Sequence, residues 1–153
     1  MKNPNLTSAE IKKKGKSSEL DISTSLSHIK DIENYRNLLI IKSETIKYAK
    51  FTVYPINREK ILKLTLVDLT QIDENIEIFS KKLQKYKIIH SSGLVLSDGK
   101  IYFECYLELS YDDDKYRDLK IFLEKNKSKF KDIKVEELSL SKSKVSLNGY
   151  MEN

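Results

Sequence analysis

Residues 88–109, IIHSSGLVLSDGKIYFECYLEL, decide the fold of this chain. Two runs in which apolar residues recur at alternate positions, 88–96 and 101–109, flank the dipeptide Asp98-Gly99. Asp-Gly favours the positive φ angles of a type I′ turn, which joins two antiparallel strands through a two-residue loop. The stretch therefore predicts a β-hairpin, and the turn sets the register of its strands.

Amphipathic segments on both sides of the hairpin extend this pattern. Residues 61–69 alternate leucine with other side chains, as a strand with one buried face does. Apolar residues at helical spacing follow, with Thr70 and Asp73 as candidate caps. The acidic run 112–114 is interpreted as the start of a second helix rather than a metal site, because backbone amides and the helix dipole stabilise carboxylates there. A closing strand is expected at 132–140.

The order strand, helix, hairpin, helix, strand over residues 61–140 resembles ferredoxin-like domains, either of ACT type or like RNA recognition domains. The predicted fold class is α+β, with an antiparallel sheet and two helices on one of its faces. An N-terminal helix and strand extension is expected at 19–60. Residues 1–18 are lysine-rich and poor in apolar side chains, which predicts a disordered basic arm, and 141–153 form a C-terminal tail.

The extension at 19–60 is too apolar to be a linker. Its first part has a helical period, capped by Asp21, in Ile22, Leu26, Ile29 and Ile32. An apolar run at 38–41 and a β-branched and aromatic run at 45–54 follow. We expect this segment either to add strands to the sheet or to lie across its open face.

The sheet face opposite the helices is the candidate interaction face. Strand alternation assigns to it Lys63, Thr65, Val67, Val95, Tyr102 and Tyr106. With a two-residue turn, the helix side is expected to receive Ser92 paired with Cys105 and His90 paired with Leu107. Contiguous apolar patches seldom stay exposed, so the N-terminal segment or a second copy should cover the open face.

The formal net charge of +5 makes phosphate a candidate partner. The lysines expected to contact DNA or RNA phosphates lie in the arm and at the helix ends: Lys12, Lys13, Lys14, Lys16, Lys81, Lys85, Lys125, Lys127 and Lys129. Such contacts would be electrostatic and weakly dependent on base sequence.

The sequence offers no recognisable catalytic constellation. The spacing of its four glycines matches neither a Walker-type loop nor a dinucleotide-binding fingerprint. Cys105 is the only cysteine and alternates with apolar residues, so we interpret it as a buried small side chain. The two histidines, His28 and His90, lack neighbouring metal ligands. No catalytic, cofactor-binding or metal-binding residue is assigned, and no cofactor is expected.

Three functions remain open. The first is a non-catalytic interaction module, with a regulatory role as one reading, that assembles through its sheet with itself or a protein partner. The similarity to ACT domains does not extend to ligand binding, since the loop at 68–73 lacks their glycine or proline. The second is an accessory nucleic-acid-binding protein: residues 100–106 are similar to an RNA-recognition strand, although Tyr102 and Tyr106 are four residues apart and flank Glu104. The third is an enzyme of unrecognised type.

The expected location is the cytoplasm. No stretch reaches the roughly 20 apolar residues of a membrane-spanning helix, and the first residues lack the apolar stretch of a signal peptide. A membrane partner is therefore not expected.

Overall fold

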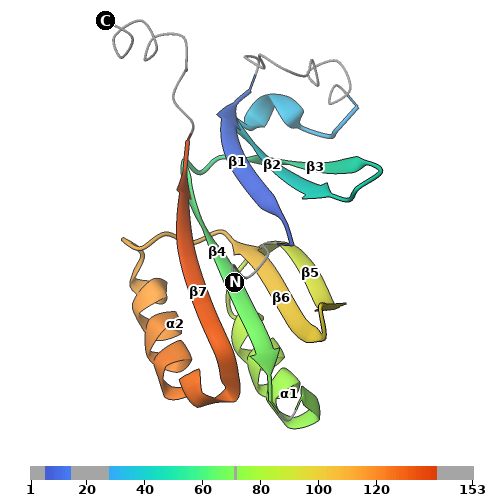
Figure 1. Cartoon of the computed structure of the whole chain (residues 1–153). Helices are drawn as coiled ribbons and strands as arrows, with labels where there is room; N and C mark the ends of the chain where they lie inside the picture. Colours follow the sequence, from blue (N-terminus) through green and yellow to red (C-terminus); the bar gives the residue numbers. More distant parts are fainter. Residues whose placement is uncertain (1–5, 15–27, 71, 141–153) are drawn as a thin grey trace, which may run out of the picture.

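The computed structural model describes residues 6–14, 28–70 and 72–140. Its strands and helices are β1 (Ser8–Lys13), β2 (Asn37–Glu44), β3 (Ala49–Ile56), β4 (Lys60–Leu69), α1 (Ile72–Leu83), β5 (Ile88–Ser97), β6 (Lys100–Leu107), α2 (Asp114–Lys125) and β7 (Phe130–Ser139). Short 3-10 helices occupy Ile32–Asn34 and Lys127–Lys129. Two antiparallel sheets result: sheet A, ordered β1-β2-β3, and sheet B, ordered β5-β6-β4-β7 (Figure 1). The α+β class is confirmed.

The hairpin of β5 and β6 confirms the predicted turn. Asp98 and Gly99 have φ angles of 51° and 73°, and Leu96 pairs with Ile101. Further along, the expected partners of Ser92 and His90 are wrong. Ser91 pairs with Cys105 and His90 with Tyr106, because two register shifts, at 88–90 and 91–94, interrupt the ladder. Extra residues on one strand of a pair produce such a β-bulge, and Gly93, at φ +66°, supplies the left-handed residue.

Both helices cover one face of sheet B. Leu62, Leu64 and Leu66 of β4 point to this side and are buried with residues of α1 and α2. Phe79 of α1 packs edge-on against Phe122 of α2 with ring centroids 5.0 Å apart. Burying an aliphatic or aromatic side chain contributes about 1.5–3 kcal/mol, so this layer carries much of the stability.

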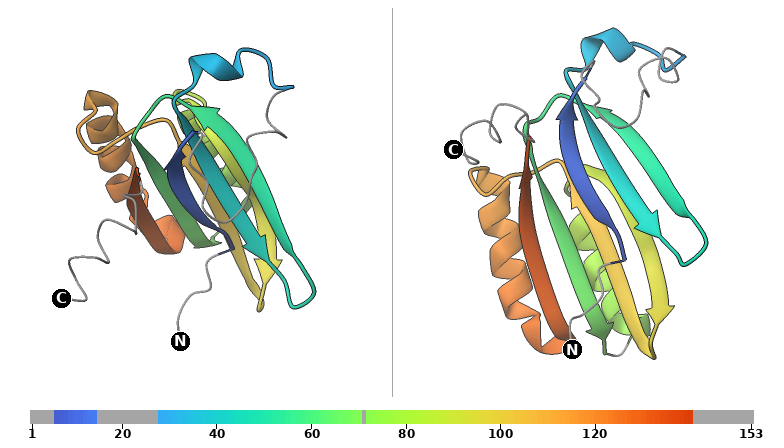
Figure 2. Two further views of the ribbon diagram at one scale, coloured as in Figure 1. Left: turned by 90° about the horizontal axis from the view of Figure 1, so that it is seen from above. Right: turned by 45° about the horizontal axis from the view of Figure 1, so that its top comes forward.

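Sheet A lies across the opposite face of sheet B (Figure 2). Leu39 and Ile41 of β2 and Ile11 of β1 are buried in one cluster with Ile61 and Tyr106 of sheet B. Of the two alternatives expected for the N-terminal segment 19–60, β2 and β3 lie across the open face and do not add strands to sheet B.

The basic arm is not disordered between Ser8 and Lys13. This stretch is β1, paired with β2 throughout, because the apolar side chain of Ile11 is fully buried against sheet B. The expected helix near the N-terminus begins in 15–27, which lies outside the described residues, as do 1–5 and the tail 141–153. Within the described part, only the 3-10 helix Ile32–Asn34 falls in that region.

The acidic run at 112–114 does start α2, which begins at Asp114 with Asp113 as its N-cap. The Asp113 side chain makes no capping hydrogen bond to the helix. Instead the carboxylate accepts from the Ser110 amide at 2.8 Å and from Arg58 Nη2 at 2.7 Å. Asp113 therefore ties the β6–α2 loop to the start of β4. None of the helices in the described ranges is both long and apolar enough to cross a lipid bilayer.

Candidate assembly interface

The predicted interaction face is covered by the chain itself. Tyr102, Tyr106 and Lys63 are 1%, 0% and 3% exposed. Thr65 and Val67 are also buried, and Val95 is half-buried. The side chains of Tyr102 and Tyr106 are therefore not available for partner contacts or base stacking, and residues of sheet A pack against Tyr106. The alternation assigned these residues to one face correctly, but it could not show that the face is occupied.

A buried ion pair explains how charges are tolerated beneath sheet A. Lys63 Nζ lies 3.3 Å from Glu104 Oε2, and both side chains are almost fully buried. Lys63 also donates to the Thr7 carbonyl at 2.7 Å, while Glu104 accepts from the Leu6 amide at 3.1 Å and from the Thr7 hydroxyl. A buried pair is stable only when its remaining hydrogen-bonding capacity is met. The residues just before β1 supply those bonds.

Aromatic and histidine side chains continue this polar layer. Thr7 Oγ1 and Tyr106 Oη share a hydrogen bond of 2.7 Å, and burial raises the pKa of Tyr106 to about 12, so its phenol stays protonated. Tyr54 Oη of β3 lies 2.7 Å from His90 Nδ1 of β5. Burial lowers the pKa of His90, and Lys50 lowers it further. The bulge thus brings His90 to the sheet A side rather than the helix side.

Strand β5 is the edge of sheet B that remains for a partner. From 88 to 97 it contains no Asp, Glu, Lys or Arg. Exposed strand edges normally carry charges or proline, which discourage pairing with another chain. Leu94 and Leu96 of β5 are 45% and 74% exposed. This edge therefore exposes apolar side chains and has no charged residue that would discourage pairing with another strand.

The other edge strands differ from β5. Strand β7 carries Lys131, Asp132, Lys134, Glu136 and Glu137, β1 carries Glu10, Lys12 and Lys13, and β3 carries Lys50 and Pro55. These are the residue types that protect an edge. Within the described strands, an edge lacking both charges and proline is found only at β5.

The register next to the turn shows which backbone groups face outward. Ser97 and Lys100 flank a two-residue loop and pair with each other. In an antiparallel ladder, hydrogen-bonded and non-hydrogen-bonded pairs alternate, and the pair flanking such a turn is hydrogen-bonded. The amides and carbonyls of Leu94 and Leu96 consequently point away from β6. A second strand could extend the sheet there.

The lysines predicted to contact phosphate are divided among three parts of the molecule. The first group, on β1 or just after it, is Lys12, Lys13 and Lys14, and the second, at the end of α1 or just after it, is Lys81 and Lys85. The third group, at the end of α2 and in the 3-10 helix that follows, is Lys125, Lys127 and Lys129. Lys16 is outside the described residues. The Thr70 amide donates to the Lys129 carbonyl at 2.8 Å, so the α2 group lies beside the start of α1. Those of these lysines that the structure describes therefore fall into three groups, at β1, at the end of α1 and at the end of α2.

The single cysteine and the possible metal ligands are further candidate functional groups. Cys105 is fully buried, which raises the pKa of its thiol to about 12 and keeps it protonated. Within the described residues no group of three or more His, Cys, Asp or Glu side chains is placed to hold a metal ion.

Two features of this interface escaped the sequence interpretation. One was the bulge, for which Gly93 inside a strand pattern was the available signal. The other was the uncharged edge, visible as ten residues without a formal charge in a chain that is 33% charged. Comparison of the chain with protein-family models, with curated protein sequences and with solved structures finds no match.

Proposed function

We propose that this protein is a non-catalytic assembly module that joins a second copy of itself through the edge strand β5. The observation that carries the proposal is the combination of exposed Leu94 and Leu96 with an edge free of charge. Addition of a strand to a sheet edge supplies main-chain hydrogen bonds, and apolar side chains add packing. An extended segment of another protein would use the same groups.

A second copy fits this edge because antiparallel pairing of a strand with itself is self-complementary. A two-fold axis at Val95 pairs Leu94 of one copy with Leu96 of the other. The outward backbone groups of both residues then meet, and their side chains extend the apolar layer on the helix side. The absence of charge on 88–97 avoids like-charge contacts across the axis.

We further propose that sheet B and its two helices form a ferredoxin-like unit. The order β5-β6-β4-β7 and the position of both helices on one face support this. Such a sheet has two edge strands, and here charges guard only β7.

The alternative function, an accessory nucleic-acid-binding protein, rests on net charge. Exposed lysines such as Lys85 and Lys127 are available, but their separation favours weak, salt-sensitive contacts. The same sedimentation samples, mixed with duplex DNA or RNA, test this alternative.

Analytical ultracentrifugation over a range of concentrations tests self-assembly. The wild-type chain should sediment as a dimer, and Leu96→Lys should shift it to the monomer by placing a charge on the edge. Ile121→Lys is the matched control, since Ile121 is an exposed residue of α2, which lies beside β7 at the opposite edge of sheet B (Figure 1). A wild-type monomer at every concentration, or a Leu96→Lys dimer, would contradict the proposal.

A further inference from the structure

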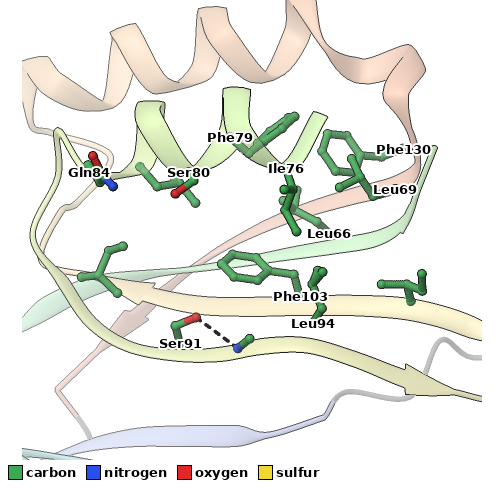
Figure 3. Close-up of a pocket in the computed structure, with 14 residues that line it drawn as sticks. Leu66, Leu69, Ile76, Phe79, Ser80, Gln84, Ser91, Leu94, Phe103 and Phe130 are labelled. Carbon is green, nitrogen blue, oxygen red and sulfur yellow. Dashed lines mark hydrogen bonds between the residues drawn. The ribbon is translucent and has the colours of Figure 1, made fainter. Parts of the chain in front are cut away.

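A cavity of about 400 Å³ lies between α1 and sheet B (Figure 3). Helix α1 forms one wall, and strands β4, β5 and β6 form the other. Small-molecule sites in proteins typically have volumes of about 300–1,000 Å³, so this cavity is large enough for a ligand. The partial exposure of Ile88 and Leu94 at β5 shows that α1 leaves this side of the sheet incompletely covered.

The bulge in β5 helps to create the space. Ser91 and Gly93 line the cavity, and the register shift turns His90, which a regular strand would direct toward the helix, to the sheet A side. A Cβ atom placed on Gly93 would meet nothing within 4 Å, and the φ of +66° disfavours any other residue there. The Ser91 hydroxyl accepts from the Gly93 amide at 3.2 Å, which holds this shape.

The walls of the cavity are apolar. Leu66, Phe79 and Phe103 contribute side chains from β4, α1 and β6. Side-chain polar groups come from Ser80 of α1, from Gln84, which directly follows α1, and from Ser91. All three residues are exposed, so they lie at the rim of the cavity. No charged residue occurs among the described residues that line the cavity.

We infer that this cavity binds a small, uncharged, largely aliphatic or aromatic molecule with one neutral hydrogen-bonding end. The apolar walls would remove the hydrocarbon part from water, and Ser80, Gln84 and Ser91 would meet the hydroxyl, amide or ester end. A buried carboxylate or ammonium would lose its hydration with no charged lining residue to compensate. This ligand site goes beyond the proposed assembly function and does not require it.

Fluorescence titration with N-phenyl-1-naphthylamine, an uncharged apolar probe, tests the site. We expect saturable binding at one site per chain and displacement by decanol. Sodium decanoate and decylammonium should displace the probe at least about tenfold less effectively. Equal displacement by decanoate, or no saturable binding to either the wild-type chain or Leu96→Lys, would overturn the inference.

Two substitutions on α1 locate the probe. Ser80→Phe places a ring at the cavity and should weaken probe binding by about tenfold or more, whereas Ile78→Phe adds a ring at an exposed position outside the lining and should leave it unchanged. Circular dichroism and thermal unfolding verify that both variants are folded. Gln84→Leu should keep the probe and reduce displacement by decanol. Equal probe affinities in Ser80→Phe and Ile78→Phe would place the probe elsewhere and overturn the inference.

The Leu96→Lys variant separates this inference from the assembly proposal. Probe binding equal to wild type in that variant supports a ligand site that is independent of dimerisation. Binding by Leu96→Lys but not by the wild-type chain would mean that a second copy occupies the cavity, which would overturn the ligand inference while supporting assembly.

Discussion

The two faces of sheet B are both buried, yet they achieve burial in different ways. On the helix face Leu62, Leu64 and Leu66 pack against apolar side chains of α1 and α2. On the opposite face Lys63 and Thr65, from the same strand, lie under sheet A beside Glu104. One strand thus serves an apolar layer with its even-numbered residues and a mixed polar layer with its odd-numbered ones.

Burial of the charged side chains on the second face depends on pairing rather than on hydrophobicity. A charge beneath sheet A is acceptable only while its partner is present, whereas a leucine under the helices needs only a space of matching shape. The hydroxyl of Thr65 is the buried side-chain group for which no partner is found within the described residues. Single substitutions should therefore destabilise the protein more in the polar layer than in the apolar layer.

Removing one charge should have the largest effect. Glu104→Ala leaves Lys63 buried without a counter-ion and should lower the free energy of unfolding by about 3–5 kcal/mol. Urea denaturation followed by circular dichroism measures the loss. Glu104→Gln keeps the size and part of the hydrogen bonding, so it should cost less. A loss below about 1 kcal/mol in Glu104→Ala would show that water reaches this layer.

Truncation on the helix face should come next. Leu64 is fully buried, and Leu64→Ala should cost about 2–5 kcal/mol through lost contacts and the cavity that remains. The matched control is Leu96→Ala, at a largely exposed position, which should change stability by less than about 0.5 kcal/mol in a chain kept monomeric by dilution. Equal losses in the two variants would contradict the assignment of even-numbered β4 residues to the core.

Replacing both charges at once sharpens the contrast. The double variant Lys63→Met, Glu104→Leu removes the buried pair and substitutes apolar volume. Such replacements are often neutral or stabilising by about 1–4 kcal/mol, so the double variant should be clearly more stable than Glu104→Ala alone. A double-mutant cycle with Lys63→Met and Glu104→Leu measures the coupling. Additive single losses would mean that the two groups do not act as a pair.

The smallest effect concerns pH. Burial lowers the pKa of His90, so the unfolded chain takes up a proton at higher pH than the folded protein. The stability due to neutral His90 is therefore present above the unfolded pKa of about 6.5 and is lost as pH falls from there toward the folded pKa. Thermal unfolding from neutral to mildly acidic pH should show this slope. His90→Gln should flatten it, and an unchanged slope would assign the pH dependence to other groups.

Local chemistry made much of sheet B predictable. Asp98-Gly99 required positive φ at both turn positions, and the alternation in 61–69 separated Leu64 from Lys63 before any tertiary contact was known. The bulge was missed because strict alternation from the turn places Ser92 opposite Cys105, and the irregularity at 91–94, which includes Gly93, breaks that alternation. The proposed assembly edge was likewise hidden, since an edge exists only once the strand order is known.

Local sequence accounts for the order of the elements in sheet B and for the shared faces of β4, β6 and the end of β5 next to the turn, because turn chemistry and side-chain periodicity act over a few residues. The tertiary structure alone decided that β1, with its lysines and the buried Ile11, covers the second face of that sheet. It also decided that Lys63 meets Glu104 and that β5 is left at an edge. These outcomes depend on contacts between residues far apart in the chain. A pattern that spans a few residues does not reveal the free energies of such contacts.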